Sequence, residues 1–204
     1  LKKSYENAKL IITTSKYTVS YLRTMFPNIK KNIFKVNLSV DSNKFKIKKK
    51  TNLITYMPRK LPSHSSLLIF YLKNLLPKNW KILPLRNVTE KKLIKTLSNS
   101  KIFLSFSNFE GLGIPPIEAA LSGNKVIGYV GGGGSEYWKK PIFTKVENGE
   151  IRDFGIKVLQ NIKRYDHNWI KNTKIQRKKL SSQYSKKLEI KSIFNFSNKV
   201  LKFF

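Results

Sequence analysis

The sequence predicts an α/β protein built on a doubly wound parallel sheet. From Leu53 onward, short β-type runs alternate with helical patterns, and this alternation favours parallel strands joined by right-handed crossovers. Gly- or Pro-rich corners follow three of the predicted strands, at 57–60, 107–116 and 131–138. Ligands of such sheets bind at the carboxyl ends of the strands. These three corners are therefore the candidate site.

The first 50 residues predict one strand-helix unit and a second strand. Residues 9–13 are the first strand, and Ser15 is a suitable N-cap for a helix that continues to Met25 and is stopped by Pro27. A further strand is expected near 33–38. The polar run at 46–51 then predicts a boundary between two lobes.

The central elements follow from hydrophobic periodicity. Five side chains recur at i, i+3, i+4, i+7 and i+8 and predict one buried helix face: Leu68, Tyr71, Leu72, Leu75 and Leu76. Two further helices are expected at 90–98 and 115–122, and strands at 52–58, 80–83, 101–106 and 125–130.

After Ile151 the chain is predicted to be helical again. Near its end, an apolar stripe needs a covering surface: Ile190, Ile193, Phe194, Leu201 and Phe204.

The composition excludes several classes of protein. The chain has no Cys, so it forms neither a disulfide scaffold nor a thiolate metal site, and no Asp-x-Asp or His-x-x-x-His pair suggests a metal. The net charge of +30 is compatible with a nucleic acid or an anionic membrane as partner. Lys is spread through almost every segment and no nucleic-acid-binding motif is visible, so we favour a broad compositional drift and consider nucleic acid the weaker partner.

The corner FEGLGIPPIEAALSG, residues 109–123, combines features of a ligand site. Pro115 and Pro116 suit the first turn of a helix, which places Glu118 in that turn, and Gly123 suits its C-terminal end. A glycine loop before a helix N-terminus offers amide groups to a phosphate, while Glu110 and Glu118 offer acceptors to sugar hydroxyls. A purely structural interpretation also exists, because a first-turn acid is stabilised by the helix dipole alone.

The stretch SFSNFEGLGIPPIEAALSGNKVIGYVGGGGSE resembles the donor-binding signature of retaining GT-B glycosyltransferases of the group 1 and family 4 type. Glu110 and Glu118 have the E-x7-E spacing of that signature, and the glycines and prolines agree with it. The resemblance implies a Rossmann-like donor lobe, the C-terminal half of a GT-B fold, with C-terminal helices. It implies residues 1–50 as the tail of the N-terminal lobe and the crossing, 51–165 as the nucleotide-sugar-binding lobe, and 166–204 as helices that pack back toward the N-terminal lobe.

The same resemblance implies roles for individual residues. Glu110 meets the transferred sugar, Glu118 binds the ribose hydroxyls, and Arg59 holds the diphosphate, so we expect Glu110 and Arg59 to be catalytic. The remaining expected contacts to the donor come from the two glycine corners and their neighbours: Gly111, Leu112, Gly113, Ile114, Gly132, Gly133 and Glu136. A first-turn helix acid accounts for Glu136 equally well.

The chain departs from the family pattern next to Arg59. Pro58 stands where Gly is usual, and His64 stands where a Lys is common. Lys60 is our candidate substitute for that Lys, and we expect His64 to be an exposed loop imidazole.

The resemblance implies metal-free chemistry with a nucleotide-diphosphate sugar as donor substrate and no cofactor. The expected acceptor is a bacterial-type glycan or glycolipid, and the missing acceptor contacts come from an N-terminal lobe or a partner chain. Zero Cys and the positive charge suggest a cytoplasmic location, with peripheral contact at the anionic inner membrane face. Two alternatives stay open: a noncatalytic remnant or subunit of the same fold, and a basic module for nucleic acid or anionic membrane.

Overall fold

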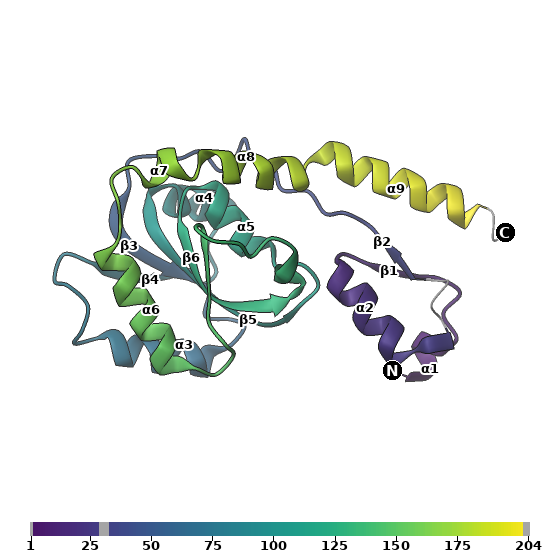
Figure 1. The fold of residues 1–204 in the computed structure, drawn as a ribbon, viewed down its shortest axis with the longest axis horizontal. Helices are drawn as coiled ribbons and strands as arrows, with labels where there is room; N and C mark the ends of the chain where they lie inside the picture. The colour runs from purple at the N-terminus through teal and green to yellow at the C-terminus, as the bar shows by residue number, and fades with distance from the viewer. Residues whose placement is uncertain (1, 29–32, 202–204) are drawn as a thin grey trace.

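The computed structural model describes residues 2–28 and 33–201, and Figure 1 shows their arrangement. Its strands are β1 (Ile11–Thr13), β2 (Ile33–Lys35), β3 (Thr51–Tyr56), β4 (Lys81–Pro84), β5 (Ser100–Glu110), β6 (Lys125–Gly132) and β7 (Phe143–Lys145). Its α-helices are α1 (Lys2–Glu6), α2 (Lys16–Met25), α3 (Pro62–Leu72), α4 (Glu90–Asn99), α5 (Ile114–Leu121), α6 (Ile151–Lys163), α7 (Trp169–Asn172), α8 (Lys174–Gln183) and α9 (Lys186–Val200). A short 3₁₀ helix, η2, spans Gly133–Glu136.

The main sheet is parallel throughout and has the order β4-β3-β5-β6-β7. From β3 the chain moves to one side of the sheet through β4, and then returns past β3 to build the other side from β5 onward. The strand order therefore reverses between β3 and β5, which lie side by side with Tyr56 opposite Leu104. In doubly wound sheets this reversal creates a crevice at the carboxyl ends of the strands.

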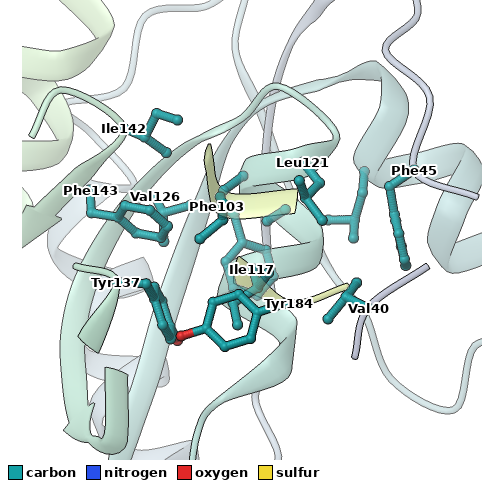
Figure 2. Close-up of a cluster of buried hydrophobic side chains, with 14 of the residues drawn as sticks. Val40, Phe45, Phe103, Ile117, Leu121, Val126, Tyr137, Ile142, Phe143 and Tyr184 are labelled. Atoms are coloured by element: carbon teal, nitrogen blue, oxygen red, sulfur yellow. The ribbon is translucent and has the colours of Figure 1, made fainter. Parts of the chain in front are cut away.

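Helices cover both faces of the sheet and enclose two cores. On one face α3 and α6 pack together, and buried Leu68 and Leu72 meet Phe154 and Val158. On the other face α5 packs against α4 and α8. There the rings of Tyr137 and Tyr184 meet with centroids 5.9 Å apart, and Ile117 lies close to them in Figure 2.

The N-terminal residues form a separate unit. Strands β1 and β2 pair with each other, not with the main sheet, and a third small core contains Ile11, Leu22 and Ile33. Ser15 caps α2 by accepting a hydrogen bond from the Thr18 amide at 3.1 Å, as the sequence predicts.

The last helix, α9, connects the part that contains the main sheet to the N-terminal unit. Figure 1 shows α9 extending from α8 toward β2. The Asn37 amide donates to Ser192 Oγ at 2.9 Å, and the ring centroids of Phe34 and Phe196 are 5.7 Å apart. Along the described part of α9, Ile190, Ile193, Phe194 and Leu201 are exposed. Phe204, which the sequence places on the same stripe, lies outside the described residues.

The alternation of strands and helices is confirmed, with three differences. The helix predicted through Leu76 ends at Leu72, so Leu75 is half exposed instead of buried. Helix α5 begins at Ile114, which puts Glu118 beyond the first turn and removes the predicted dipole contact. Strand β7 was not predicted, because three residues are too short for a periodic pattern. Among the described helices, none has the length and apolar composition to cross a membrane.

Candidate functional site

A pocket of about 380 Å³ lies at the reversal of strand order between β3 and β5. One wall is the segment after β3, with Met57, Arg59 and Lys60. The opposite wall is the end of β5 and the corner that leads into α5. Two of the three predicted corners, 57–60 and 107–116, therefore meet in one cavity, and its size is within the range of small-molecule sites.

Arg59, Lys60 and Glu110 bring charge to the pocket. The Lys60 ammonium lies 2.9 Å from a carboxylate oxygen of Glu110, so two of the predicted site residues form an ion pair. Arg59 is exposed and forms no ion pair with any other described residue. A guanidinium without a protein partner is available to bind an anion through two parallel hydrogen bonds.

The glycine corner forms the floor between these charges. Gly111, Leu112, Gly113 and Ile114 all line the pocket, as predicted. Gly113 precedes α5 with φ 78°, a left-handed conformation that residues with a Cβ rarely adopt. The first amides of a helix have no carbonyl partner within it. Pro115 and Pro116 have no N–H, so the Ile114 amide is the donor that the start of α5 offers to a ligand oxygen.

Tyr137 stabilises this glycine corner through a hydrogen bond to its backbone. Its buried hydroxyl donates to the Gly113 carbonyl at 2.7 Å. Burial first, and then the nearby Tyr184 and Glu110, raise the pKa of Tyr137 well above its ordinary value. The hydroxyl therefore stays protonated and remains a donor.

The second glycine corner supports the pocket without lining it. A Cβ on Gly133 would come within 2.0 Å of the Gly111 carbonyl oxygen, so the two glycine corners touch through their backbones. A Cβ on Gly132 would come within 2.4 Å of the Tyr17 ring. Gly132 and Gly133, predicted as donor contacts, thus lie against other parts of the protein.

Glu136 is also engaged within the protein. The backbone amide of Lys16 at the start of α2 donates to the Glu136 carboxylate. Glu136 lies in the first turn of η2, as the structural interpretation of this residue requires, and its carboxylate also lies at the N-terminus of α2.

Glu118 lies on α5 and is not among the side chains that line the pocket. It is half-buried, and its pKa is raised first by burial and then by the neighbouring Glu90 carboxylate. In the described part of the chain Glu118 has no cationic partner. The pocket therefore brings together Arg59, Lys60, Glu110 and the 111–114 corner, but not the second acid of the pair.

The expectation for His64 is wrong. His64 lies in the first turn of α3 and is half-buried, because its Nδ1 is 3.1 Å from the hydroxyl of Tyr129 on β6. It fastens α3 to the sheet instead of standing free in a loop.

Sequence reasoning missed the contribution of the N-terminal unit. Thr14, between β1 and α2, lines the pocket, and its Oγ1 would meet a Cβ on Gly111 at 2.7 Å. This proximity joins positions almost one hundred residues apart, and no local pattern at Thr14 signals it.

A wider hollow of about 1140 Å³ lies between α2, β2 and α9. Lys16, Arg23, Lys35 and Lys199 line it, and none of the described residues that line it carries a carboxylate. Within residues 2–28 and 33–201, no group of three or more His, Asp or Glu is placed to hold a metal ion. The pocket at the strand reversal is therefore the better candidate, since it alone of the two combines cations, helix amides and a carboxylate.

Fold and pocket together define an α/β lobe with a candidate site at the carboxyl edge of a parallel sheet. Comparison with protein-family profiles and with curated protein sequences finds no match.

Solved structures do match. A glycosyltransferase from Rickettsia africae ESF-5 has a TM-score of 0.75 at 15% identity, covering 98% of this chain and 67% of the other. HepE from Anabaena, in complex with UDP and glucose, has a TM-score of 0.74 at 13% identity, covering 97% of this chain and 65% of the other. A variant of TarM from S. aureus, in complex with fondaparinux, alpha-GlcNAc-glycerol and UDP, has a TM-score of 0.75 at 19% identity, covering 95% and 45%.

The chain therefore has the fold of the C-terminal lobe of GT-B glycosyltransferases, as the sequence resemblance predicted. It spans 45% to 67% of the length of these three proteins.

Proposed function

We propose that this chain is the donor-binding part of a glycosyltransferase that transfers a sugar, with retention, from a nucleotide-diphosphate sugar to a glycan or lipid-linked acceptor. One observation carries the proposal: Arg59, Lys60, Glu110 and residues 111–114 line one pocket at the strand reversal. The cations and amides suit a diphosphate, and the carboxylate suits sugar hydroxyls. The solved complexes of HepE with UDP-glucose and of TarM with UDP, proteins of the same fold, support this choice of ligand.

The chemistry follows from charge. Breaking the bond between the anomeric carbon and the diphosphate builds negative charge on the leaving group. Arg59, Lys60 and the N-terminus of α5 are placed to stabilise that charge without a metal ion. Each charge-assisted hydrogen bond is worth about 1.5 to 3 kcal/mol. Glu110 binds the transferred sugar in this scheme, and a ligand phosphate replaces it as the partner of Lys60.

We assign the nucleoside ribose to Glu118. A half-buried carboxylate without a cationic partner in the described structure is costly unless hydroxyl groups donate to it. We propose a supporting role for the second glycine corner. Gly133 packs on the pocket-lining corner, while Gly132 and Glu136 position α2.

The proposed division of the chain is the one that the resemblance implies: 1–50, 51–165 and 166–204. Residues 1–50 then belong to a lobe of which this chain holds a part, and the rest of that lobe, in the same or a partner chain, covers the exposed residues of α9. Transfer is proposed to require that lobe. Cytoplasmic nucleotide sugars as donors imply a cytoplasmic location, which cell fractionation tests.

Titration calorimetry against UDP-, GDP-, ADP- and dTDP-sugars tests the proposed ligand. We expect one base to bind with micromolar affinity or better. We expect Arg59→Gln and Glu118→Ala each to weaken that binding by on the order of tenfold or more. Arg152→Gln is the control, because Arg152 is exposed on α6 and does not line the pocket. Absence of binding by the whole panel would overturn the proposal.

A transfer assay with and without an added N-terminal lobe separates an enzyme from a noncatalytic subunit of the same fold. Tight donor binding without transfer in either arm would support the noncatalytic alternative.

A further inference from the structure

The outward side of α3 is apolar where a surface helix is normally polar. Leu68 and Leu72 point into the core and are fully buried, but Phe70 is 79% exposed and Leu67 is 56% exposed. Leu75, just beyond the helix, is 50% exposed. A water-soluble helix buries one apolar stripe, whereas α3 carries large apolar side chains on the opposite side too. Half or more of each of these side chains is therefore exposed to solvent in the described structure.

Two lysines accompany these apolar residues at the C-terminal end of α3. Lys73 follows Phe70 by three positions in a continuing helical turn, and its amide donates to the Phe70 carbonyl at 3.3 Å. Lys73 and Lys78 are both exposed. We call Leu67, Phe70, Lys73, Leu75 and Lys78 the outer α3 patch.

Acidic residues are absent from this part of the sequence. Residues 42–89 contain 11 Lys and Arg and no Asp or Glu. The polar neighbours of the outer α3 patch along the chain are neutral Ser and Asn, such as Ser66 and Asn74. The patch therefore offers apolar contact and positive charge without any carboxylate of its own segment to repel an anionic partner.

The position of α3 leaves the patch open. Within the described structure α3 packs on α6 and the sheet, and the N-terminal unit lies at the other end of the molecule in Figure 1. A larger lobe built around β1, β2 and α2 would thus extend away from α3. The exposed apolar residues of α9, in contrast, lie beside that unit.

We propose that the outer α3 patch binds the surface of a bilayer that contains anionic lipids. Phe70, Leu67 and Leu75 enter the boundary between headgroups and acyl chains, while Lys73 and Lys78 bind lipid phosphates. An interfacial helix of this kind has large apolar side chains beside Lys, and the patch has both.

Helix α3 begins two residues after Lys60, and the patch lies at and beyond its other end. Binding through the patch would therefore hold the pocket about one helix length from a membrane surface. The inference does not depend on the identity of the donor.

Site-specific labelling tests the patch directly. The chain has no Cys, so Phe70→Cys places a single environment-sensitive fluorophore on α3. Ile175→Cys provides the matched control, because Ile175 is 85% exposed on α8 at the other sheet face. With vesicles of phosphatidylcholine and phosphatidylglycerol we expect a blue shift for the α3 label only. Equal shifts for both labels, or no shift for either, would overturn the proposal.

Vesicle sedimentation at physiological salt gives the second readout. We expect Leu67→Ser/Phe70→Ser to reduce the bound fraction strongly and Lys73→Gln/Lys78→Gln to reduce it as well. Lys178→Gln/Lys179→Gln is the charge-matched control on α8 and should have little effect. Equal losses for both lysine pairs would show diffuse attraction by the net charge and contradict the assignment.

Phosphatidylcholine alone tests the role of the anionic lipid, and we expect weaker binding to it. Circular dichroism checks that each variant is folded. If sedimentation velocity shows a dimer that Leu67→Ser/Phe70→Ser dissociates, and vesicles do not bind, the patch is an interface between copies and the proposal is wrong.

Discussion

Lys60 and Glu110 form an ion pair of 2.9 Å in which both side chains line the same pocket. The pair joins the segment after β3 to the end of β5, the two strands between which the strand order reverses. A diphosphate that enters the pocket competes with Glu110 for Lys60. If the diphosphate carries a sugar, hydroxyl groups of that sugar can donate hydrogen bonds to the Glu110 carboxylate in place of Lys60.

This relationship predicts opposite effects of Glu110→Gln on two ligands. For the nucleoside diphosphate, removal of the competing charge should raise affinity up to about fivefold, which corresponds to about 1 kcal/mol for an exposed ion pair. For the matching nucleotide sugar, the lost acceptor should cancel this gain or lower the affinity. Titration calorimetry measures the affinities for both ligands in Glu110→Gln and in the unmodified protein.

Glu147→Gln is the control for that experiment. Glu147 pairs with Lys145 at 2.6 Å outside the pocket, so its change should leave both affinities unaltered. A parallel rise for both ligands with Glu110→Gln would show that Glu110 does not contact the sugar.

Tyr137→Phe should destabilise the glycine corner. The change removes the hydroxyl that donates to the Gly113 carbonyl at 2.7 Å, while the carbonyl keeps its place as the N-cap acceptor of α5. The expected loss is about 0.5 to 1.5 kcal/mol of unfolding free energy, together with weaker donor binding. Urea unfolding and calorimetry measure the two effects.

Tyr71→Phe provides the comparison, because the Tyr71 hydroxyl has no hydrogen-bond partner among the described residues. It should change stability by a few tenths of a kcal/mol or less. Equal effects of the two substitutions would mean that the bond to Gly113 contributes nothing specific.

The sequence predicted what local patterns encode. Alternating strands and helices, the Ser15 cap and the meeting of the 57–60 and 107–116 corners are all confirmed. Each depends on hydrophobic period, capping chemistry or the general geometry of parallel sheets.

The features that the sequence did not predict depend on contacts between residues far apart in the chain. Thr14 reaches the pocket, and Glu136 binds the amide of Lys16, across segments more than ninety residues apart. The glycines at 132 and 133 resemble ligand-binding positions in sequence, yet their missing side chains make room for Tyr17 and for backbone. Glycine is required both where a ligand approaches and where the protein approaches itself, and only the fold distinguishes the two cases.

Gly133→Ala should separate the two glycine corners. Its new Cβ would come within 2.0 Å of the Gly111 carbonyl oxygen, and backbone atoms have to move to relieve this overlap. Overpacking of this kind costs about 1 to 3 kcal/mol, and the displaced corner should also bind the donor more weakly. Thermal unfolding and calorimetry measure the changes.

The neighbouring Gly134→Ala is a stringent control. A Cβ there would have its nearest contact at 3.3 Å, with a side-chain atom of Val130, which small adjustments accommodate. Donor affinity that falls equally in both variants would contradict the contact between the two corners.

The buried position of Lys50 leads us to predict that the stability of the fold depends on pH. Its ammonium donates to the carbonyls of Leu97 and Ser122, at the ends of α4 and α5, and no carboxylate of a described residue pairs with it. Burial first, and then the nearby Arg177, lower the pKa of Lys50 to about 7. The unfolded chain, with the ordinary pKa of 10.5, therefore binds more protons than the folded chain between pH 7 and 10.5. Stability consequently rises with pH across this window.

Lys50→Met should remove this contribution. We expect the unfolding free energy of the unmodified protein to increase, relative to Lys50→Met, as the pH rises from 7 toward 10. Lys101 and Lys125, whose pKa values are also lowered by burial, are present in both proteins, so their contributions cancel in the difference. Lys49→Met, at an exposed neighbouring position, is the control substitution. Urea unfolding at several pH values measures these differences, and a Lys50→Met difference that stays constant with pH would show that Lys50 remains charged in the fold.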